Sequence, residues 1–475
     1  MHFCYIYVDM KRFFATTALA SIAASLTACT SVPPANDMVP DAGQYSFPAA
    51  ATETRPGSLD QSSLSSPWYE AAVAPELASL LQIAAEQSPA IRIQAKRVEQ
   101  AEANLQSAEA SRWIDVVLSG NASADYDLDS NDSTDSRRAA LGLDLPLDVS
   151  GRLRTLRDAA RYNLYTSAAT YDQTRNTELR DLSLNVIDAS ESALLYRLIE
   201  EQIETSRTLL QLTELRFAQG QASIVDVLQQ RDQIASLEQQ LPPLRANRVS
   251  AIDAIATATG TPPAEDDMPA LLADIPVITP VDAYPQADVL FDTRPDLRAS
   301  VYALRADNAT YTAAILNRLP SFGLSGSAVS SLVSGNASEF VTATVSGALT
   351  VFDSGAKDAA IDFSRARYEE SGILLLQDWL DALAEINGLI SSENEGLENI
   401  RLTQDRLETS RQLLESARRR YRQGASDYLP VLDALSSIQT QERRLINLQA
   451  EQARIRIRLH AALGLPAQTM TERTI

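Results

Sequence analysis

Few residues of this chain could take part in covalent or metal chemistry. Its only cysteines are Cys4 and Cys29, and its only histidines are His2 and His460. Because three of these four lie within the first 29 positions, the rest of the chain cannot build a Cys–His dyad or a zinc site from Cys and His. It also lacks a nucleophile elbow, a phosphate-binding glycine loop and a metal-binding motif. The sequence therefore argues against an enzyme, and we expect His460, near a helix end, to be structural.

Cys29 is the exception, because it stands at the end of an export leader. Residues 10–12 (Met-Lys-Arg) are basic, and residues 13–26 form an apolar run too short for a retained membrane helix. Residues 26–29 read Leu-Thr-Ala-Cys, which matches the bacterial lipobox, in which the cysteine thiol is acylated and becomes the first mature residue. An ordinary signal peptide with an incidental cysteine is the alternative. We expect a lipoprotein signal peptide over residues 1–28, and a covalent lipid on Cys29.

The residues on either side of this leader give further expectations. The first nine residues fit no leader, so we expect translation to start at Met10. Thr30 follows the cysteine, and by resemblance to sorted lipoproteins the absence of aspartate there favours the outer membrane. Residues 29–67 contain several Pro, Ser and Ala residues but little periodicity, which indicates an extended tether from the lipid to the first helix.

The composition favours long helices and disfavours nucleic-acid binding. The 475 residues include 62 acidic and 41 basic side chains, and the resulting net charge of -21 repels nucleic-acid phosphates. Aromatic residues make up only 6%, whereas Ala, Leu, Gln, Arg and Glu are abundant. This mixture is typical of long helices and coiled coils.

The second half of the chain repeats the first, at a constant offset of 204 positions over about sixty residues and with a two-residue slip upstream. Residues 204–210 (Glu-Thr-Ser-Arg-Thr-Leu-Leu) recur at 408–414, and the Arg-aromatic-x-Gln-Gly sequence at 216–220 recurs at 420–424. Such a match indicates an internal duplication. We therefore divide the mature chain beyond the tether into a first repeat at 68–263, a linker rich in Pro and Asp at 264–287, a second repeat at 288–467 and a C-terminal tail at 468–475.

Each repeat contains a β-hairpin pattern, at about 113–148 and about 321–352. In both, apolar residues alternate with small or polar ones, and in the second repeat the alternation reaches Val351. Segments of about ten residues with this pattern suit the strands of an outer-membrane barrel. An amphipathic hairpin on a soluble core is the alternative, but the lipobox and the duplication favour the membrane strand. The aspartate-rich turn near 125–135 lacks the Gly and Glu of a calcium loop, so we expect a solvated extracellular loop without metal.

A very long helix is expected after each hairpin. Residues 152–219 contain no Gly or Pro and, at 1.5 Å per residue, would form a helix about 100 Å long. Residues 356–423 contain no Pro, and both repeats show apolar residues in the steps of three and four that characterise coiled coils. Each long helix is followed by a return helix, with tips near 220 and 424. Pro242 and Pro243 interrupt the first return helix, so we expect a kink or break there.

Four strands per chain cannot close a membrane barrel, which needs about eight or more. An open sheet edge in hydrocarbon leaves N–H and C=O groups unpaired, and this requires several copies of the chain. Two copies would give eight strands filled by side chains, and three would give twelve with room for a pore. The acidic, Ser- and Thr-rich inner face favours three. The fold class we expect is therefore mixed, with long helices and transmembrane β-strands.

Between about residues 68 and 467 the chain resembles the TolC-like outer-membrane efflux factors, in the lipoprotein branch that serves resistance-nodulation-division pumps. The resemblance rests on the two Arg-aromatic-x-Gln-Gly turns, on residues 149–151 (Val-Ser-Gly) and 353–355 (Asp-Ser-Gly) after the second and fourth strands, and on the lipobox. It implies a homotrimer with a twelve-stranded β-barrel, four strands per chain, on a long periplasmic α-helical barrel. The implied partners are a periplasmic adaptor (membrane fusion) protein, an inner-membrane pump and outer-membrane lipid.

The resemblance also assigns a role to the two turns near 220 and 424. They would form the helical hairpin tips at the periplasmic entrance, against which the adaptor packs. Glycine suits the left-handed position that ends a helix, and a following Ser or Asp suits the cap of the next helix. The residues expected to contact the adaptor are Arg216, Gly220, Ala222 and Ser223 in the first tip and Arg420, Gly424, Ser426 and Asp427 in the second.

Residues just beyond the second tip match the segment that closes the entrance in this family. By resemblance, Leu429 and Asp433 would point inward as constricting rings, and Asp226 would make hydrogen bonds between helices. Three like charges near one axis repel each other, so modest energies could open such a ring. Some family members carry a second acidic residue where this chain has Pro430, which leaves one aspartate ring here. The alternative for Asp433 is a solvated carboxylate on a helix face.

These observations predict the outer-membrane channel of a tripartite efflux system. It would passively conduct small molecules, such as drugs or other toxic compounds, from the periplasm to the exterior, with no catalytic residues and no cofactor beyond the lipid on Cys29. One alternative is the conduit of a polypeptide secretion system, which the lipobox disfavours. Another is a periplasmic coiled-coil scaffold lipoprotein without a pore, which the two-faced strands disfavour.

Overall fold

The computed structural model describes residues 38–40, 73–127, 129, 132–262, 274–281, 284, 287–423 and 425–464. The chain divides into two compact units, residues 1–39 and 40–475, and the helices and strands from α3 onward belong to the second. The expected signal peptide, Cys29, most of the tether, Gly424 and the C-terminal tail lie outside the described residues.

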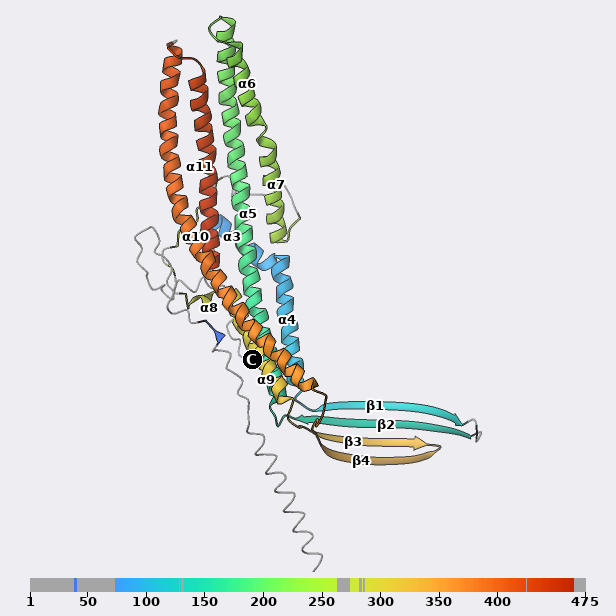
Figure 1. The fold of residues 1–475 in the computed structure, drawn as a ribbon. Coiled ribbons are helices and arrows are strands. Elements are labelled where there is room, and N and C mark those ends of the chain that lie inside the picture. The colour runs from blue at the N-terminus through green and yellow to red at the C-terminus, as the bar shows by residue number, and fades with distance from the viewer. Residues whose placement is uncertain are drawn as a thin grey trace, which may run out of the picture. The chain divides into compact units, whose positions relative to one another are not determined.

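Long helices and one four-stranded antiparallel sheet make up this unit (Figure 1). The first repeat contains seven of the elements: α3 (Pro75–Gln87), α4 (Pro89–Ala110), β1 (Asp115–Asp127), β2 (Asp132–Leu147), α5 (Arg152–Ala218), α6 (Ile224–Glu238) and α7 (Leu241–Thr259). The second repeat contains α8 (Leu290–Thr293), α9 (Pro295–Leu316), β3 (Ser321–Val333), β4 (Asn336–Ala348), α10 (Ala356–Arg422) and α11 (Leu429–Ala462). The sheet has the order β1-β2-β3-β4. β4 ends at Ala348, so the alternation that continues to Val351 in the sequence outlasts the strand.

A glycine and an aspartate turn the chain from each hairpin into its long helix. α5 and α10 each contain 67 residues and start at equivalent positions of the two repeats. The residues before them, Gly151 and Gly355, adopt left-handed backbone angles with φ of 77° and 88°. The carboxylate of Asp148 accepts the backbone N–H of Leu153 at 3.0 Å, and Asp353 plays the same part for α10. These aspartates satisfy N–H groups that the first helical turn leaves without intrahelical partners.

The interruption expected at Pro242 and Pro243 is confirmed. α6 ends at Glu238 and α7 begins at Leu241, with the prolines in the first turn of α7. A missing N–H is harmless at that position because it has no intrahelical acceptor. The equivalent stretch of the second repeat lies inside the continuous helix α11.

Of the two largest apolar cores, one lies where the helices of the two repeats meet and the other lies within the second repeat. The first joins α3, α5, α7 and α11, and includes Leu182, Val186 and Ile457, each essentially buried. The second joins α8, α9, α10 and α11. The coiled-coil spacing in α5 is thus confirmed by burial. No helix in the described ranges is both long enough and apolar enough to cross a membrane.

Candidate functional site: a two-faced sheet and two helical tips

The register of the sheet places apolar and polar side chains on opposite faces. Leu118 pairs with Leu141, Leu141 with Ala328 and Ala328 with Val341. Paired residues point to the same face and successive residues alternate. The face of Leu141, which we call the apolar face, therefore carries Val116, Leu118, Leu141, Leu143, Leu145, Leu147, Phe322, Leu324, Val341 and Val345. The opposite, polar face carries Asp115, Ser119, Asn121, Arg138, Asp144, Ser325, Thr342 and Thr344.

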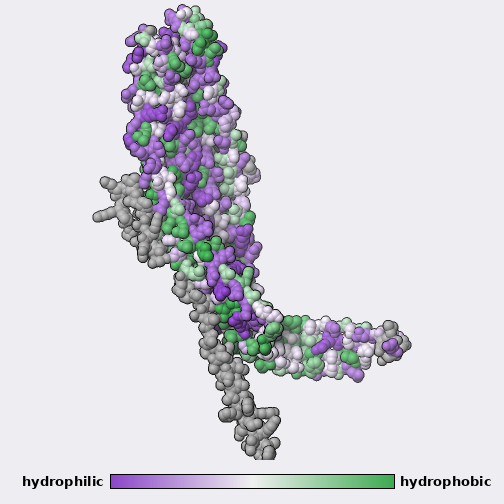
Figure 2. Space-filling view, viewed as in Figure 1, coloured by the Kyte–Doolittle hydropathy of each residue, from purple (hydrophilic) through white to green (hydrophobic). Residues whose placement is uncertain are grey.

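Within the described part of one chain, nothing covers the apolar face. Leu118 is 77% exposed, Val345 is 75% exposed and Val341 is 84% exposed. Apolar side chains gather where the strands leave the helices, whereas the helical body is largely hydrophilic (Figure 2). A contiguous apolar surface of this kind requires an apolar environment from another source, such as a bilayer.

The two edges of the sheet are also incomplete in a single chain. β1 pairs only with β2, and β4 only with β3, among the strands that the structure describes. Each edge strand is 13 residues long and would present its backbone N–H and C=O groups to a further strand. Another copy of the chain could satisfy both edges.

The first helical tip is closed by backbone geometry and a capping box. Gly220 has a φ of 69°, and the N–H of Gln221 donates to the carbonyl of Arg216 at 2.8 Å, so the last carbonyls of α5 are satisfied. The side chain of Ser223 accepts an N–H from the first turn of α6, and the carboxylate of Asp226 accepts the N–H of Ser223 at 3.0 Å. The serine cap expected here is confirmed.

The second tip starts its helix differently, and the expected Ser or Asp cap is wrong there. α11 begins at Leu429 after Tyr428, with no side-chain cap. The hydroxyl of Ser426 donates to the carbonyl of Asp427 at 2.9 Å instead. Pro430 lies in the first turn, where it removes one of the N–H groups that a cap would serve.

The remaining tip residues expected to contact an adaptor lie at or near the surface. Arg420 and Asp427 are exposed, and Ala222 is half-buried. The N–H of Ala425 donates to the carbonyl of Arg420 at 2.9 Å, which matches the closing bond of the first tip.

Leu429 and Asp433 lie one turn apart on the exposed side of α11. Leu429 is 50% exposed, and Asp433 is exposed as well. The other side of the helix, which includes Val431 and Ala434, is buried in a core with α10. Both gate candidates therefore point away from the helix pair of their own chain. Asp226 differs, because its described hydrogen bond is the local cap and not a bond to another helix.

A chain of contacts that the sequence did not reveal joins the two tips. The guanidinium of Arg216 lies 4.2 Å from the ring centroid of Tyr421, and this ring packs against Tyr428 with centroids 5.5 Å apart. The buried hydroxyl of Tyr428 donates to Oε1 of Gln230 at 2.7 Å, and Nε2 of Gln230 donates to the carbonyl of Ser206 at 2.9 Å. Burial raises the pKa of Tyr428 to about 12. These contacts hold α11 against α5 and α6.

Buried polar side chains continue this connection along the helices. Nε2 of Gln439 donates to Oγ of Ser206 at 3.3 Å, and Nε2 of Gln233 donates to Oε1 of Gln439 at 3.0 Å. Arg443 donates to Oε1 of Gln202 at 2.6 Å. The sequence does show glutamines between apolar residues on the buried sides of these helices. A hydrophobic pattern alone, however, does not predict that such glutamines bond to one another.

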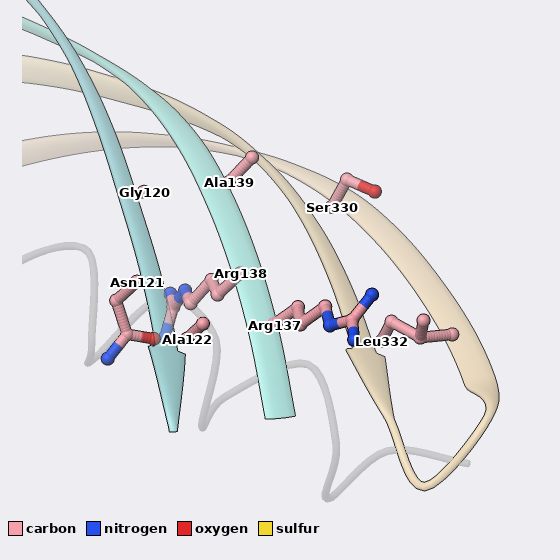
Figure 3. Close-up of a pocket in the computed structure, with 8 residues that line it drawn as sticks. All are labelled: Gly120, Asn121, Ala122, Arg137, Arg138, Ala139, Ser330 and Leu332. Carbon is pink, nitrogen blue, oxygen red and sulfur yellow. The ribbon is translucent and has the colours of Figure 1, made fainter. Parts of the chain in front are cut away.

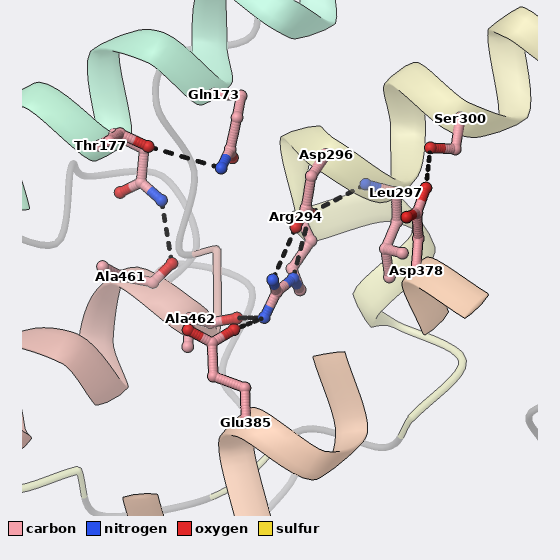
Figure 4. A network of polar contacts seen from close by, with 11 residues as sticks. Gln173, Thr177, Arg294, Asp296, Leu297, Ser300, Asp378, Glu385, Ala461 and Ala462 are labelled. Atoms are coloured by element: carbon pink, nitrogen blue, oxygen red, sulfur yellow. Dashed lines mark hydrogen bonds and ion pairs between the residues drawn. The ribbon is translucent and has the colours of Figure 1, made fainter. Parts of the chain in front are cut away.

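A second polar network ties the end of α11 to α9 and α10 (Figure 4). The buried guanidinium of Arg294 donates to Asp296 at 2.6 Å, to Glu385 at 2.9 Å and to the carbonyl of Ala462 at 3.0 Å. Burial alone lowers the pKa of Arg294, but the hydrogen bonds and charges of Asp296 and Glu385 outweigh it and raise that pKa. His460 lies nearby in sequence, and its Nε2 is 2.8 Å from the carbonyl of Thr279. Its position in the packed helix end fits a structural role.

A two-faced sheet on long paired helices with polar tips defines an outer-membrane channel subunit. The chain belongs to the outer membrane efflux protein family, whose sequence profile matches residues 80–261 and 288–465, one match in each repeat. The expected TolC-like fold, outer-membrane location and role as the channel component of an efflux system are confirmed.

Individual relatives cover nearly the whole chain. The pyoverdine export outer membrane protein OpmQ of Pseudomonas putida is 28% identical over 463 residues, which cover 94% of this chain and 96% of the relative. The probable outer membrane lipoprotein SilC of Salmonella typhimurium is 23% identical and covers 84% of this chain and 87% of its own. The open-state MtrE outer membrane channel of Neisseria gonorrhoeae has a TM-score of 0.76 at 20% identity, over 93% of this chain and 100% of that one. At this identity the last comparison supports the fold.

Proposed function

We propose that three copies of the chain form one pore, through which small molecules pass passively from the periplasm to the exterior. The observation that carries this proposal is the sheet, with one apolar face, one polar face and two open edges. Three copies would join β4 of one chain to β1 of the next and close a barrel of about twelve strands. The apolar face would then contact lipid, and the polar face would line a water-filled lumen.

The helical tips are the surface we assign to a periplasmic adaptor protein, which would link the channel to an inner-membrane pump. Exposed apolar side chains accompany the polar tip residues, since Phe217 is 44% exposed, Ile224 is 49% exposed and Val225 is 54% exposed. Apolar residues rimmed by polar ones are typical of a protein-binding surface. Arg216, Gly220, Ser223 and the matching residues of the second tip would form the polar part of this surface.

We assign membrane anchoring to an acyl chain on Cys29 in addition to the barrel. The support is the lipobox sequence and the likeness to SilC, which is named a lipoprotein. Buried acyl chains contribute about 0.8 kcal/mol per CH₂, so more than one chain gives stable attachment. Mass spectrometry of the purified N-terminus would test this, and an unmodified Cys29 would contradict it.

We further propose that Leu429 and Asp433 form the periplasmic gate. Their exposure on one side of α11 supports this role, because side chains buried within the chain could not meet across a symmetry axis. Repulsion among three Asp433 carboxylates would keep the closed state only modestly stable.

Single-channel conductance in planar bilayers tests the pore and the gate together. We expect small, rarely open wild-type channels and larger, longer openings for Asp433→Ala. Asp232→Ala is the matched control, because Asp232 is an exposed carboxylate on α6 away from the second tip. Equal conductance in both variants would remove Asp433 from the gate. Absence of conductance from folded, inserted protein would contradict the channel and favour a scaffold.

A further inference from the structure

The second tip carries a group of arginines that the first tip lacks. Residues 416–424 contain four arginines and no carboxylate, in a chain whose net charge is -21. We call these four the arginine cluster: Arg418, Arg419, Arg420 and Arg422. The equivalent positions of the first repeat hold Glu214, Leu215, Arg216 and Ala218. The two tips therefore share a backbone turn but differ in charge.

The end of the long helix does not account for this cluster. Cations near a helix C-terminus are stabilised by the partial negative charge of the last carbonyl groups. α5 and α10 both contain 67 residues, so both ends have the same requirement. The last turn of α5 has one basic residue, Arg216, whereas the last turn of α10 has three. The additional arginines point to a role beyond the helix end.

The carboxylates that balance charge in the first tip are missing from the second. Arg231 of α6 lies 2.7 Å from Glu214 of α5, and the equivalent positions hold Leu435 and Arg418. Among the described residues, one member of the arginine cluster has a carboxylate partner, at 3.9 Å. Residues 411–433 contain five arginines and three carboxylates, whereas the equivalent residues 207–229 contain two of each. The second tip thus has an excess of positive charge that its own chain does not neutralise.

The arginine cluster covers the exposed side of the last turn of α10. Because a turn takes 3.6 residues, its members spread around the helix, while Ala417 and Tyr421 between them pack into the core with α11. Arg420 and Arg422 are exposed. The guanidinium of Arg216 reaches from α5 to within 4.2 Å of the ring centroid of Tyr421 and adds a further cation beside the cluster.

Unpaired arginines on the sheet do not form a comparable surface. Arg137 and Arg138 are exposed neighbours on β2, but their side chains extend in different directions (Figure 3). Successive residues of a strand point to opposite faces, so these two cations stay apart. The second tip, in contrast, presents its cations together.

We propose that the second tip binds an acidic surface of the periplasmic adaptor. This inference rests on the proposed function, which assigns both tips to that partner. Guanidinium groups form paired hydrogen bonds with carboxylates and are always charged. Arginine is also enriched in protein interfaces and among the residues that contribute most to binding. The first tip, with exposed Leu215 and Phe217 and balanced charges, offers an apolar contact instead. One adaptor surface therefore cannot bind both tips in the same way.

The experiment measures binding of a synthetic two-helix hairpin whose turn carries glutamates. The same hairpin with glutamines is its control, and the partner is the full-length protein in phosphatidylcholine nanodiscs. We expect wild type to bind the glutamate hairpin about tenfold more tightly than the glutamine hairpin at about 50 mM salt. Most of this difference should disappear at about 300 mM salt, because screening weakens exposed ion pairs. Fluorescence anisotropy gives both affinities, and equal affinities at the lower salt would overturn the inference.

A matched pair of double variants locates the site. Arg420→Gln with Arg422→Gln should weaken binding of the glutamate hairpin about fivefold. Arg406→Gln with Arg444→Gln removes the same charge and should match wild type, because both arginines are exposed on the helical body without an ion pair to a described residue. Arg420→Lys with Arg422→Lys keeps the charge and should retain most of the binding. Equal losses in the two glutamine variants would show that net charge alone governs binding, and would overturn the site.

Two further measurements separate this inference from other possibilities. If phosphatidylglycerol vesicles bind wild type more tightly than the glutamate hairpin does, the acidic partner is a membrane, and the adaptor surface is overturned. Planar-bilayer conductance of the same wild-type preparation tests the pore. Wild type that conducts but does not distinguish the hairpins would overturn this inference alone. Wild type that distinguishes the hairpins but does not conduct would overturn the channel and leave the acidic partner in place.

Discussion

Tyr421 and Tyr428 lie in contact at the second tip but differ in what their hydroxyls do. The hydroxyl of Tyr428 bonds Gln230, whereas that of Tyr421 is buried without a hydrogen-bond partner in the part of the chain described. Tyr428→Phe should lower the free energy of unfolding by about 1–3 kcal/mol, because it leaves a buried amide oxygen unsatisfied. Tyr421→Phe should be nearly neutral, since the ring facing Arg216 is kept. Denaturant unfolding followed by circular dichroism would measure both, and equal losses would contradict the assigned hydrogen bond.

The same hydroxyl gives a pH dependence with a defined sign. Burial raises the pKa of Tyr428 to about 12, whereas an unfolded tyrosine ionises near pH 10. The stability it contributes is complete below about pH 10 and is lost as the pH rises through about 12. We expect the free energy of unfolding to fall over this window, and to fall less steeply in Tyr428→Phe. The slope must be compared between wild type and Tyr428→Phe, because burial also raises the pKa of Tyr284 to about 12 and Tyr284 contributes to the slope in both proteins. Identical slopes in the two proteins would refute the assignment.

Two glycines with similar backbone angles should respond very differently to alanine. Gly464 has a φ of 64°, and an added Cβ would lie 2.5 Å from the carbonyl oxygen of Thr293. Gly220 has a φ of 69°, but an added Cβ there meets no atom within 4 Å. Both substitutions carry the left-handed penalty of about 1–2 kcal/mol. Gly464→Ala should lower the free energy of unfolding by about 1–3 kcal/mol more than Gly220→Ala, because the backbone at residue 464 must move away from that of Thr293. Equal shifts in melting temperature would show that this helix end is looser than its backbone contacts indicate.

Single residues also mark the limit of what the sequence reveals. The glycine turns, the Ser223 cap and the proline break follow from local backbone chemistry, which a sequence displays directly. The partnership of Tyr428 with Gln230 does not, because it joins residues 198 positions apart on helices whose rotation must be known first. The missing cap on α11 has a different, local cause, since Pro430 in the first turn removes one of the N–H groups that a cap would serve.

At the scale of elements, the break between α6 and α7 is a local property of the proline pair. The second repeat has Ile446 and Asn447 at the matching positions, within one helix. Replacing Pro242 with Ile and Pro243 with Asn restores two backbone N–H groups and should let helical hydrogen bonds run through residues 239–243. Hydrogen exchange should then become slower across this stretch, while exchange in α11 stays unchanged as the internal control. Unaltered exchange would mean that packing, and not proline, sets the break.

The elements themselves were largely legible from the sequence. A long run without Gly or Pro predicted α5, a long run without Pro predicted α10, and period-two alternation predicted four strands. The end of β4 was less legible, because the alternation persists to Val351 after the strand has ended at Ala348. There the backbone must already turn toward Gly355 and the start of α10, and this tertiary requirement overrides the local pattern.

At the scale of the whole molecule, the open edges of β1 and β4 predict the number of subunits. We expect native mass spectrometry of the mature protein to show three chains, because three four-stranded sheets give a barrel wide enough for a lumen. A mass of two chains would give about eight strands, a barrel filled by its own side chains, and would contradict passive conduction. A folded single chain in the membrane would contradict the barrel itself, since both edges would face hydrocarbon.

The equal length of α5 and α10 has a consequence for how the protein can vary. Each helix has 67 residues, and at 1.5 Å per residue both reach about 100 Å from hairpin to tip. The length of these two helices therefore sets the distance between the membrane and the tips. Lengthening one helix alone would stagger the tips and separate Arg216 from Tyr421. An insertion or deletion that changes the length of α5 must therefore be matched in α10, and both must change by whole heptads. The duplication thus couples the lengths of the two long helices.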